Sequence, residues 1–542
     1  MAAKSSKSRA DPGGTVVAVK ALARTLEWCA GHARLSALVL GVVSATGFQP
    51  LGLWPVALAA VALQFALVRG AETVRRAALL GWLFGLGHFT LGNSWIAVAF
   101  TYQAEMPAVL GWAAVPLLAL YLAIYPALAC GAAKWIAHDR RGWVLAFVFA
   151  GCWIVSEWIR AGAFSGYAWN PFGVIFLGPF DRPGLASLAP WLGTYALSGV
   201  AVFVAAAAFL LVTERRFVPL GLLCVLLAVG MYLPAGAQRE GTLRFTLVQP
   251  DIRQDVLNEP VQYENNLAKT AALTLPRERG ERRLVLWPES GVPDLLRDGY
   301  PQRYYDRMTV LGSPEYARAR LGRVIGPGGV LLTGTMDLEV ANGQAVAAYN
   351  SVTALDESGA ILGGYRKAHL VPYGEYLPMR ELLEPLGVAR LVPGAMDFWP
   401  GPGPRTLDLG PWGRAGVQVC YEIVFSGEVA DRRNRPDYIF NPSNDGWFGP
   451  SGPPQHLAQA RLRAIEEGLP ILRSTTTGIS AVIDARGVVR AHVPMHRAAR
   501  LDGIVPPAAP PTLFSRLGNI LPLVWAMIFL ALGAIAMRRR HG

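Results

Sequence analysis

The sequence contains few charged residues. Lysine, arginine, aspartate and glutamate make up 16% of its 542 residues, while hydrophobic residues make up 52%. This balance excludes an ordinary soluble protein and indicates a membrane protein, and the length predicts two or more domains. The net charge is +12. The basic residues occur in short clusters rather than in a long run, which argues against a nucleic-acid partner.

Cysteines are also scarce and widely spaced. No two of them form a C-x-x-C pair, so the sequence predicts neither a zinc knuckle nor a disulfide framework. Four lie in or beside apolar segments, where packing explains them, whereas the last lies in a long polar region. The five are Cys29, Cys130, Cys152, Cys224 and Cys420. Neither a metal ion nor an organic cofactor is expected.

Eight apolar segments are predicted to cross a membrane, since a spanning helix needs about 20 apolar residues. They cover residues 35–51, 54–68, 77–100, 108–133, 143–159, 196–212, 218–233 and 517–537. The first two are short, and either a helical hairpin or one broken span fits them. We count them as two.

Basic residues between these segments predict the orientation. With eight spans, the basic N-terminus, three basic loops and the arginine-rich C-terminal tail all fall on one side, which marks the cytoplasm. With seven spans, the basic segments would no longer all fall on the same side of the membrane. Both termini are therefore predicted to be cytoplasmic. The predicted domains are a basic N-terminus (1–34) without a cleavable signal pattern, seven spans (35–235), an exported catalytic domain (241–511) and a C-terminal span (517–537).

The exported region has the alternating pattern of an α/β domain. Apolar runs typical of strands cover residues 243–249, 283–287, 330–334, 438–441 and 471–474, and a helical stretch covers 456–467. Several of the strand runs end in a polar residue. In α/β sheets, functional side chains lie at the carboxyl ends of strands.

Three residues at such positions form a plausible reaction centre: Glu289, Lys367 and Cys420. Taken singly, each residue has a purely structural explanation: Glu289 as a solvated turn residue, Lys367 as a surface cation and Cys420 as a core thiol. Together they supply a nucleophilic thiolate, a general base for its proton and a positive charge for the oxyanion. The backbone N–H of Tyr421 is a natural second oxyanion donor. An unpaired exported thiol is prone to oxidation, and a reactive role explains its presence.

Several stretches resemble the nitrilase superfamily, whose members carry a Glu-Lys-Cys triad. They are residues 287–289, 365–376, 420–422, 441–449, 455–456, 463–466 and 477–480. With its apolar segments, nearly the whole chain resembles the membrane-embedded apolipoprotein N-acyltransferases of that superfamily. The resemblance implies an αββα nitrilase-type sandwich on a polytopic α-helical membrane bundle in the bacterial inner membrane, with the catalytic domain on the periplasmic side.

The resemblance further implies a ping-pong acyl transfer by a monomer. Cys420 would take a fatty acyl chain from a phospholipid, typically phosphatidylethanolamine. The thioester would pass it to the N-terminal amine of a diacylglyceryl-cysteine apolipoprotein. Glu289 is the implied general base and Lys367 the implied oxyanion and positioning group. Supporting family positions map onto Glu375, Tyr421, Glu422 and Trp447.

One residue departs from the family pattern: Asn258 stands where members often carry a tryptophan upstream of the triad. An apolar arm at residues 382–388 and a segment at 398–400 are predicted to keep water from the thioester. Glu157 and Arg160, at the end of the fifth apolar segment, either have a function or form a snorkelling interfacial pair. The aromatic-rich loop 161–192 is predicted to lie along the membrane interface.

Two other functions compete with acyl transfer. A membrane-tethered carbon–nitrogen hydrolase would use the same triad with water as acceptor. A transporter or structural membrane protein would carry an inactive nitrilase-like domain. The intact triad and the lack of broken, repeat-related spans argue against the last reading.

Overall fold

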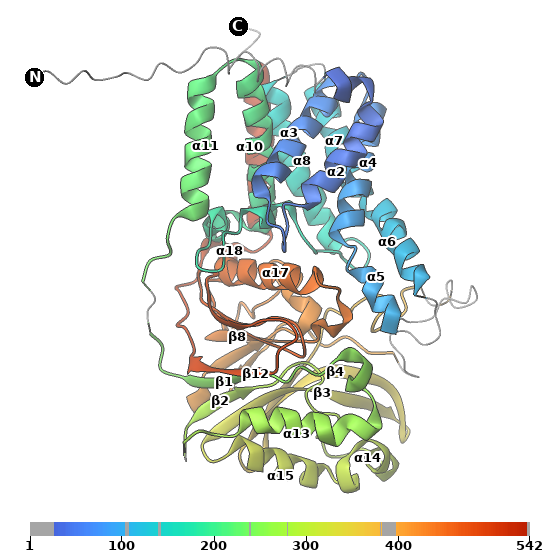
Figure 1. The fold of residues 1–542 in the computed structure, drawn as a ribbon, viewed down its shortest axis with the longest axis vertical. Helices are drawn as coiled ribbons and strands as arrows, with labels where there is room; N and C mark the ends of the chain where they lie inside the picture. The colour runs from blue at the N-terminus through green and yellow to red at the C-terminus, as the bar shows by residue number, and fades with distance from the viewer. Residues whose placement is uncertain are drawn as a thin grey trace, which may run out of the picture.

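The computed structural model describes residues 27–102, 108–138, 142–237, 240–278, 280–379, 381 and 397–538. The predicted apolar arm at 382–388 and most of the basic N-terminus lie outside these residues. Within them, a helical bundle stands on a two-sheet domain along the long axis of the molecule (Figure 1).

Each predicted apolar segment contains one or two helices of the bundle. Their bounds are α2 Ala33–Ala45, α3 Trp54–Gly70, α4 Val74–Gly92, α5 Ile96–Ala99, α6 Val109–Leu122, α7 Ile124–Ala137, α8 Trp143–Gly162, α10 Thr194–Thr213, α11 Phe217–Tyr232 and α19 Ile520–Arg538. The first two predicted segments form two separate helices, because α2 ends at Ala45 and the chain turns before Pro55 starts α3.

Fewer helices have spanning length than the eight predicted. Among the described residues, four are long and apolar enough to cross a membrane: Val109–Ala137, Trp143–Gly162, Thr194–Thr213 and Ile520–Arg538. A fifth is possible if Val74–Gly92 and Ile96–Tyr102, which meet at a bend of 51°, count as one span. The helices α2, α3 and α11 are apolar but shorter, because turns shorten the apolar runs that the sequence presents as continuous.

Two six-stranded sheets form the second part of the molecule, in the orders β12-β1-β2-β3-β4-β5 and β11-β10-β9-β8-β7-β6. The neighbours β1, β2 and β3 are parallel, as are β7, β8 and β9. The strands are β1 Arg244–Gln249, β2 Arg283–Leu286, β3 Gly329–Ala341, β4 Gln344–Asp356, β5 Ile361–Arg366, β6 Thr406–Asp408, β7 Arg414–Val417, β8 Tyr438–Ser443, β9 Ile471–Thr475, β10 Ser480–Ile483, β11 Val489–Val493 and β12 Ala499–Ile504. Every strand predicted from the sequence is present.

The sheets pack face to face through apolar side chains such as Leu332 of β3 and Phe440 of β8. On the outer face of the first sheet lie α13 (Tyr263–Thr274) and α15 (Pro314–Ile325). On the outer face of the second lies α17 (Gly452–Glu467). Strands covered on both faces are mostly apolar, and β2, which is apolar after Arg283, is buried along its whole length. This αββα arrangement confirms the predicted nitrilase-type sandwich.

Short helices complete the fold. They are α9 Ala189–Leu192, α12 Gln254–Leu257, α14 Gln302–Met308 and α18 Leu513–Leu517, with the 3-10 helices η1 Phe100–Tyr102, η2 Phe172–Phe176, η3 Leu185–Leu188, η4 Pro260–Gln262, η5 Val310–Gly312, η7 Gly410–Trp412, η8 Cys420–Val424 and η9 Asp445–Trp447.

The helix α17 joins the sandwich to the bundle, and it lies between them in Figure 1. Leu457 packs on the second sheet, while Leu462 packs in the bundle core. Glu466 accepts hydrogen bonds from the backbone N–H and the hydroxyl of Thr194, both at 2.6 Å, at the start of α10. Arg463 forms an ion pair of 2.7 Å with the same carboxylate. A buried polar contact thus reinforces the apolar packing at this junction.

The loop between α8 and α10 is buried in part, while Phe180 and Trp191 remain exposed, and its position along the membrane interface stays a prediction. Trp169 and Phe172 are buried, and Trp169 Nε1 donates a hydrogen bond to Gln455 of α17 at 2.8 Å. This part of the loop fills the space between the bundle and α17. Its aromatic side chains are buried there among apolar neighbours.

Glu157 and Arg160 hold this loop and do not snorkel. Both side chains are buried. Glu157 accepts hydrogen bonds from Trp153 Nε1 at 3.0 Å and from the backbone N–H of Phe172 at 2.8 Å. Arg160 donates to the carbonyl oxygen of Trp169 at 3.0 Å.

Candidate active site

Cys420 lies at a strand-to-turn corner, as the sequence predicts. It follows β7 and begins η8. Its φ of 50° places it in the left-handed region, which costs a non-glycine residue about 1–3 kcal/mol and persists where neighbours enforce it. Here Glu422 accepts a hydrogen bond from the Val419 N–H at 2.7 Å, and His456 Nε2 lies 3.0 Å from the Cys420 carbonyl oxygen.

Two carboxylates share one buried ammonium group beside this corner. Lys367 Nζ lies 3.7 Å from Glu289 Oε1 and 2.8 Å from Glu375 Oε2. Asn350 Nδ2 donates to both carboxylates, at 2.7 Å to Glu289 and 2.8 Å to Glu375. The second oxygen of Glu289 accepts from the backbone N–H of Asn444 at 2.8 Å. Glu289, Lys367 and Glu375 are therefore held in one polar cluster.

The charges of this cluster act on the Cys420 thiol. Burial raises the pKa of Cys420 well above its usual value, the charge of Glu289 raises it further, and Lys367 lowers it. Burial lowers the pKa of Lys367, but the charges of Glu375, Glu289 and Cys420 outweigh that effect and raise it. At neutral pH the site thus combines a neutral thiol with an ammonium group.

Glu422 joins the Lys367 loop to the Cys420 turn. Its Oε1 accepts hydrogen bonds from the Tyr365 hydroxyl and the Ala368 N–H, both at 2.7 Å. Its Oε2 binds the Val419 N–H. Because the side chain is buried and bonds groups of both segments, Glu422 fixes the Lys367 loop relative to the Cys420 turn.

The sequence analysis did not identify three residues behind the thiol as site residues, although it noted the stretches that contain them. Arg473 Nη2 donates to both oxygens of Asp445 at 2.8 Å and lies 2.9 Å from His456 Nδ1. Burial and Arg473 lower the pKa of His456. A neutral imidazole whose Nδ1 accepts from Arg473 carries its proton on Nε2 and donates it to the Cys420 carbonyl. This chain of bonds supports the strained turn.

Cys420, Asp445 and His456 present donor atoms that lie within 4.8 Å of one another, a spacing that suits a metal ion. Arg473, however, already binds both Asp445 oxygens and approaches His456. Its fixed positive charge opposes a cation at the same place, so this donor set fits the guanidinium better than a metal.

The remaining predicted residues, Tyr421 and Trp447, contact aromatic neighbours. The Tyr421 ring packs edge-on against Phe425 at 5.1 Å, and its hydroxyl donates to Gly166 O at 3.4 Å. Trp447 is half-buried and packs edge-on against Tyr102 of η1, at 5.9 Å between ring centroids. Through Gly166 and Tyr102, both residues contact the N-terminal part of the chain that forms the bundle. Asn258 caps α12 on an exposed turn.

Two family models match the chain. The apolipoprotein N-acyltransferase N-terminal domain matches residues 40–207, and the carbon-nitrogen hydrolase domain matches residues 246–496. Among curated proteins, apolipoprotein N-acyltransferase of Bradyrhizobium diazoefficiens is 35% identical, over 96% of this chain and 97% of its own length. The Rhodopseudomonas palustris and Nitrosomonas europaea proteins of the same name are 34% and 32% identical, over 93% of this chain and 95% and 98% of theirs.

Solved structures are similar to about half of the chain. A nitrilase-superfamily amidase from Nesterenkonia AN1 covers 52% of this chain and 96% of its own, with 19% identity and a TM-score of 0.35. The Nit3 protein of Saccharomyces cerevisiae, of the same superfamily, covers 50% and 92%, with 18% identity and a TM-score of 0.34.

Proposed function

Because the chain belongs to the apolipoprotein N-acyltransferase family, and therefore N-acylates lipoproteins in a bacterial membrane, we propose that a thioester on Cys420 carries the acyl group. The observation that carries this proposal is the cluster in which Lys367 lies between Glu289 and Glu375, because the charges of Lys367 and Glu289 act on the one thiol of the sandwich.

The first half-reaction loads the enzyme from a phospholipid, with phosphatidylethanolamine as the proposed donor. Glu289 accepts the thiol proton as Cys420 Sγ attacks an ester carbonyl carbon. The Lys367 ammonium and the Tyr421 N–H stabilise the oxyanion. The ester C–O bond then breaks, Glu289 returns the proton to the leaving alkoxide, and a lysophospholipid departs.

The second half-reaction unloads the enzyme. The N-terminal amine of the diacylglyceryl-cysteine acceptor attacks the thioester carbonyl, and Glu289 takes a proton from the nitrogen. The C–S bond breaks, and that proton returns to the sulfur. Glu375 keeps Lys367 in place throughout, because its ion pair with Nζ is the shorter of the two. Trp447, at the rim toward the bundle, is proposed to contact substrate.

We place the catalytic domain on the periplasmic side of a bundle of about eight passes, with both termini in the cytoplasm. The basic loops fall on one side in that arrangement. The bent pair Val74–Gly92 and Ile96–Tyr102, counted as one span, and the shorter apolar helices α2, α3 and α11 are proposed to complete the eight beside the four longer ones. A monomer suffices, since one chain supplies every residue of the proposed centre.

Product analysis tests this function. A phospholipid with a labelled acyl chain is incubated with the purified protein, with and without a diacylglyceryl-cysteine peptide. The label is expected on the peptide amine, with little free fatty acid. Release of free fatty acid at the same rate with and without the peptide would identify a hydrolase that uses water as acceptor instead.

A further inference from the structure

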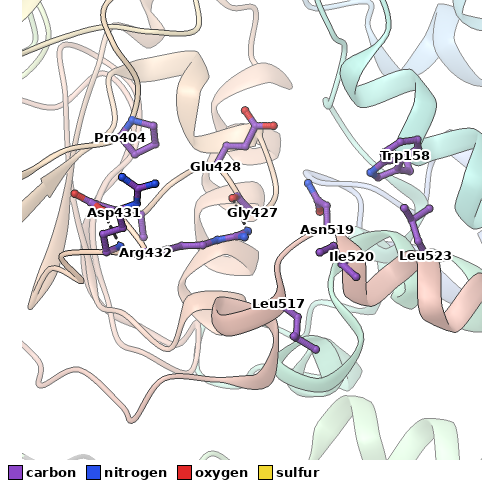
Figure 2. A pocket seen from close by; sticks show the side chains of 12 residues that line it. Trp158, Pro404, Gly427, Glu428, Asp431, Arg432, Leu517, Asn519, Ile520 and Leu523 are labelled. Carbon is purple, nitrogen blue, oxygen red and sulfur yellow. Dashed lines mark hydrogen bonds between the residues drawn. The ribbon is translucent and has the colours of Figure 1, made fainter.

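A cleft of about 570 Å³ opens where the sandwich meets the ends of α8 and α19. None of its lining residues belongs to the Cys420 cluster. Figure 2 shows residues of the 427–433 loop on one side, facing Trp158 and Leu523 on the other. Ligand sites in proteins have volumes of about 300–1,000 Å³, so the cleft is large enough for a small polar group with part of an apolar chain.

The bundle wall of the cleft is apolar. Trp158 lies near the end of α8, and Ile520 and Leu523 lie in the first turn of α19. Trp158 and Ile520 remain exposed, at 38% and 65%. An exposed tryptophan at the end of a spanning helix is typical of the membrane–water interface. This wall therefore continues the lipid-facing surface of the bundle up to the level of the headgroups.

The opposite wall carries Arg432 and Arg433 together with two acids, Glu428, which pairs with His369, and Asp431, which accepts hydrogen bonds from the backbone N–H groups of Arg433 and Asn434. Arg432 Nη2 donates to the Gly427 carbonyl oxygen at 3.0 Å, and the guanidinium packs so closely on Gly518 that a Cβ atom there would not fit. Arg433 is exposed beside it. Among the residues that the structure describes, neither guanidinium forms an ion pair with a carboxylate. The positive end of the 19-residue helix α19 points to the same cleft.

We propose that this cleft is the docking site of the donor phospholipid, with the phosphate between Arg432 and Arg433 and the start of an acyl chain along Trp158 and Leu523. The proposal rests on the proposed function. Paired arginines beside a helix N-terminus suit a phosphate, and the apolar wall selects a lipid phosphate over a free one.

A short chain of contacts connects the cleft to the reaction centre. Glu428, which lines the cleft, lies 3.0 Å from His369 Nε2. The His369 ring stacks on Phe425 at 4.1 Å, and its backbone N–H donates to Glu422 at 3.2 Å. His369 is two residues from Lys367. A lipid in this cleft therefore lies beside the loop that carries the ammonium group, which suits a donor rather than an unrelated bilayer lipid.

Steady-state kinetics of the full chain in mixed micelles test the site. The double variant Arg432→Gln/Arg433→Gln is expected to raise the KM for phosphatidylethanolamine at least about tenfold, since each lost charged hydrogen bond weakens binding by about that factor. The kcat and the KM for the acceptor peptide should change less than about twofold. Arg307→Gln, which removes one charge from the exposed helix α14 at the opposite end of the molecule, is the matched control. An unchanged KM for the phospholipid overturns the proposal.

A second readout does not need turnover. The Cys420→Ala variant, which cannot form a thioester, is irradiated with a phospholipid that carries a photoreactive headgroup, and the cross-linked peptides are mapped. Cross-links are expected at residues 427–433 and 517–523 and should be lost on adding the two arginine substitutions. Cross-links elsewhere, or cross-links that survive, contradict the site. A wild-type enzyme that never acylates Cys420 would overturn the proposed function but leave this binding result standing.

Discussion

Lys367 Nζ lies 2.8 Å from Glu375 Oε2, closer than its 3.7 Å separation from Glu289 Oε1. The two carboxylates also share the amide of Asn350. Glu375 is thus the nearer anion of the ammonium group. This difference between two glutamates with the same partners gives the first prediction.

Glu375→Gln should lower kcat by about 100-fold, because the ammonium group loses its nearest anion and with it the position from which it meets the oxyanion. Initial rates of peptide N-acylation measure the effect. Glu357→Gln, at an exposed turn between β4 and β5, is the matched control and should act like the wild type. A Glu375→Gln enzyme within twofold of wild type would remove Glu375 from the site.

The titration of the Cys420 thiol should respond oppositely to its two charged neighbours. Glu289 raises the pKa of Cys420 and Lys367 lowers it. Since only the thiolate is alkylated, Glu289→Gln should move the midpoint of the pH–alkylation curve down, and Lys367→Met should move it up. Both variants should nevertheless lose acyl transfer. Iodoacetamide labelling of the Cys420 peptide, followed by mass spectrometry, gives the midpoints. An upward shift in Glu289→Gln would refute this electrostatic account.

His456 should act through the shape of the Cys420 turn. His456→Ala removes the hydrogen bond to the Cys420 carbonyl oxygen and is expected to lower kcat by about 10- to 100-fold. His456→Gln, whose amide nitrogen reaches the position of Nε2, should restore most of the rate. A merely space-filling role predicts no such rescue, so equal rates for the two variants count against the positioning role.

Glu466→Gln should destabilise the whole chain. It leaves Arg463 buried without its anion, and breaking a buried ion pair costs about 3–5 kcal/mol. Thermal unfolding in detergent should show a Tm lower by several degrees. Glu264→Gln removes an ion pair whose glutamate is 72% exposed, and such pairs contribute about 0–1 kcal/mol. Equal Tm values for both variants would mean that the junction at α17 does not depend on Glu466.

The sequence alone predicts the site residues that stand at strand ends or within a recognisable motif. Glu289 follows β2 of the first sheet and Cys420 follows β7 of the second, and functional side chains of α/β domains lie at the carboxyl ends of strands. Lys367 and Glu375 lie within one recognisable stretch. The apolar and alternating runs likewise predict both the helical bundle and the strands of the sandwich.

Other residues of the site depend on tertiary pairing that no local pattern records. Asn350 lies inside β4, and only the register of β4 with its neighbours brings its amide between two glutamates. Arg473 lies inside β9, and the sequence shows only a charged residue in a strand. Its contacts with Asp445 and His456 become visible only in the fold. The composition of the loop at 161–192 predicts an interfacial position, but it does not reveal that Trp169 packs beside α17 and Phe172 in the bundle core.

The central claim is that Cys420 carries the acyl group between the two substrates. Mass spectrometry of the Cys420 peptide, after incubation with phospholipid alone, tests it most directly. The account predicts one fatty acyl group on Cys420, which disappears when the acceptor peptide is added and is absent from Cys420→Ala. Acylation of the acceptor peptide by Cys420→Ala at the wild-type rate, or an acyl group on a different residue, would contradict it.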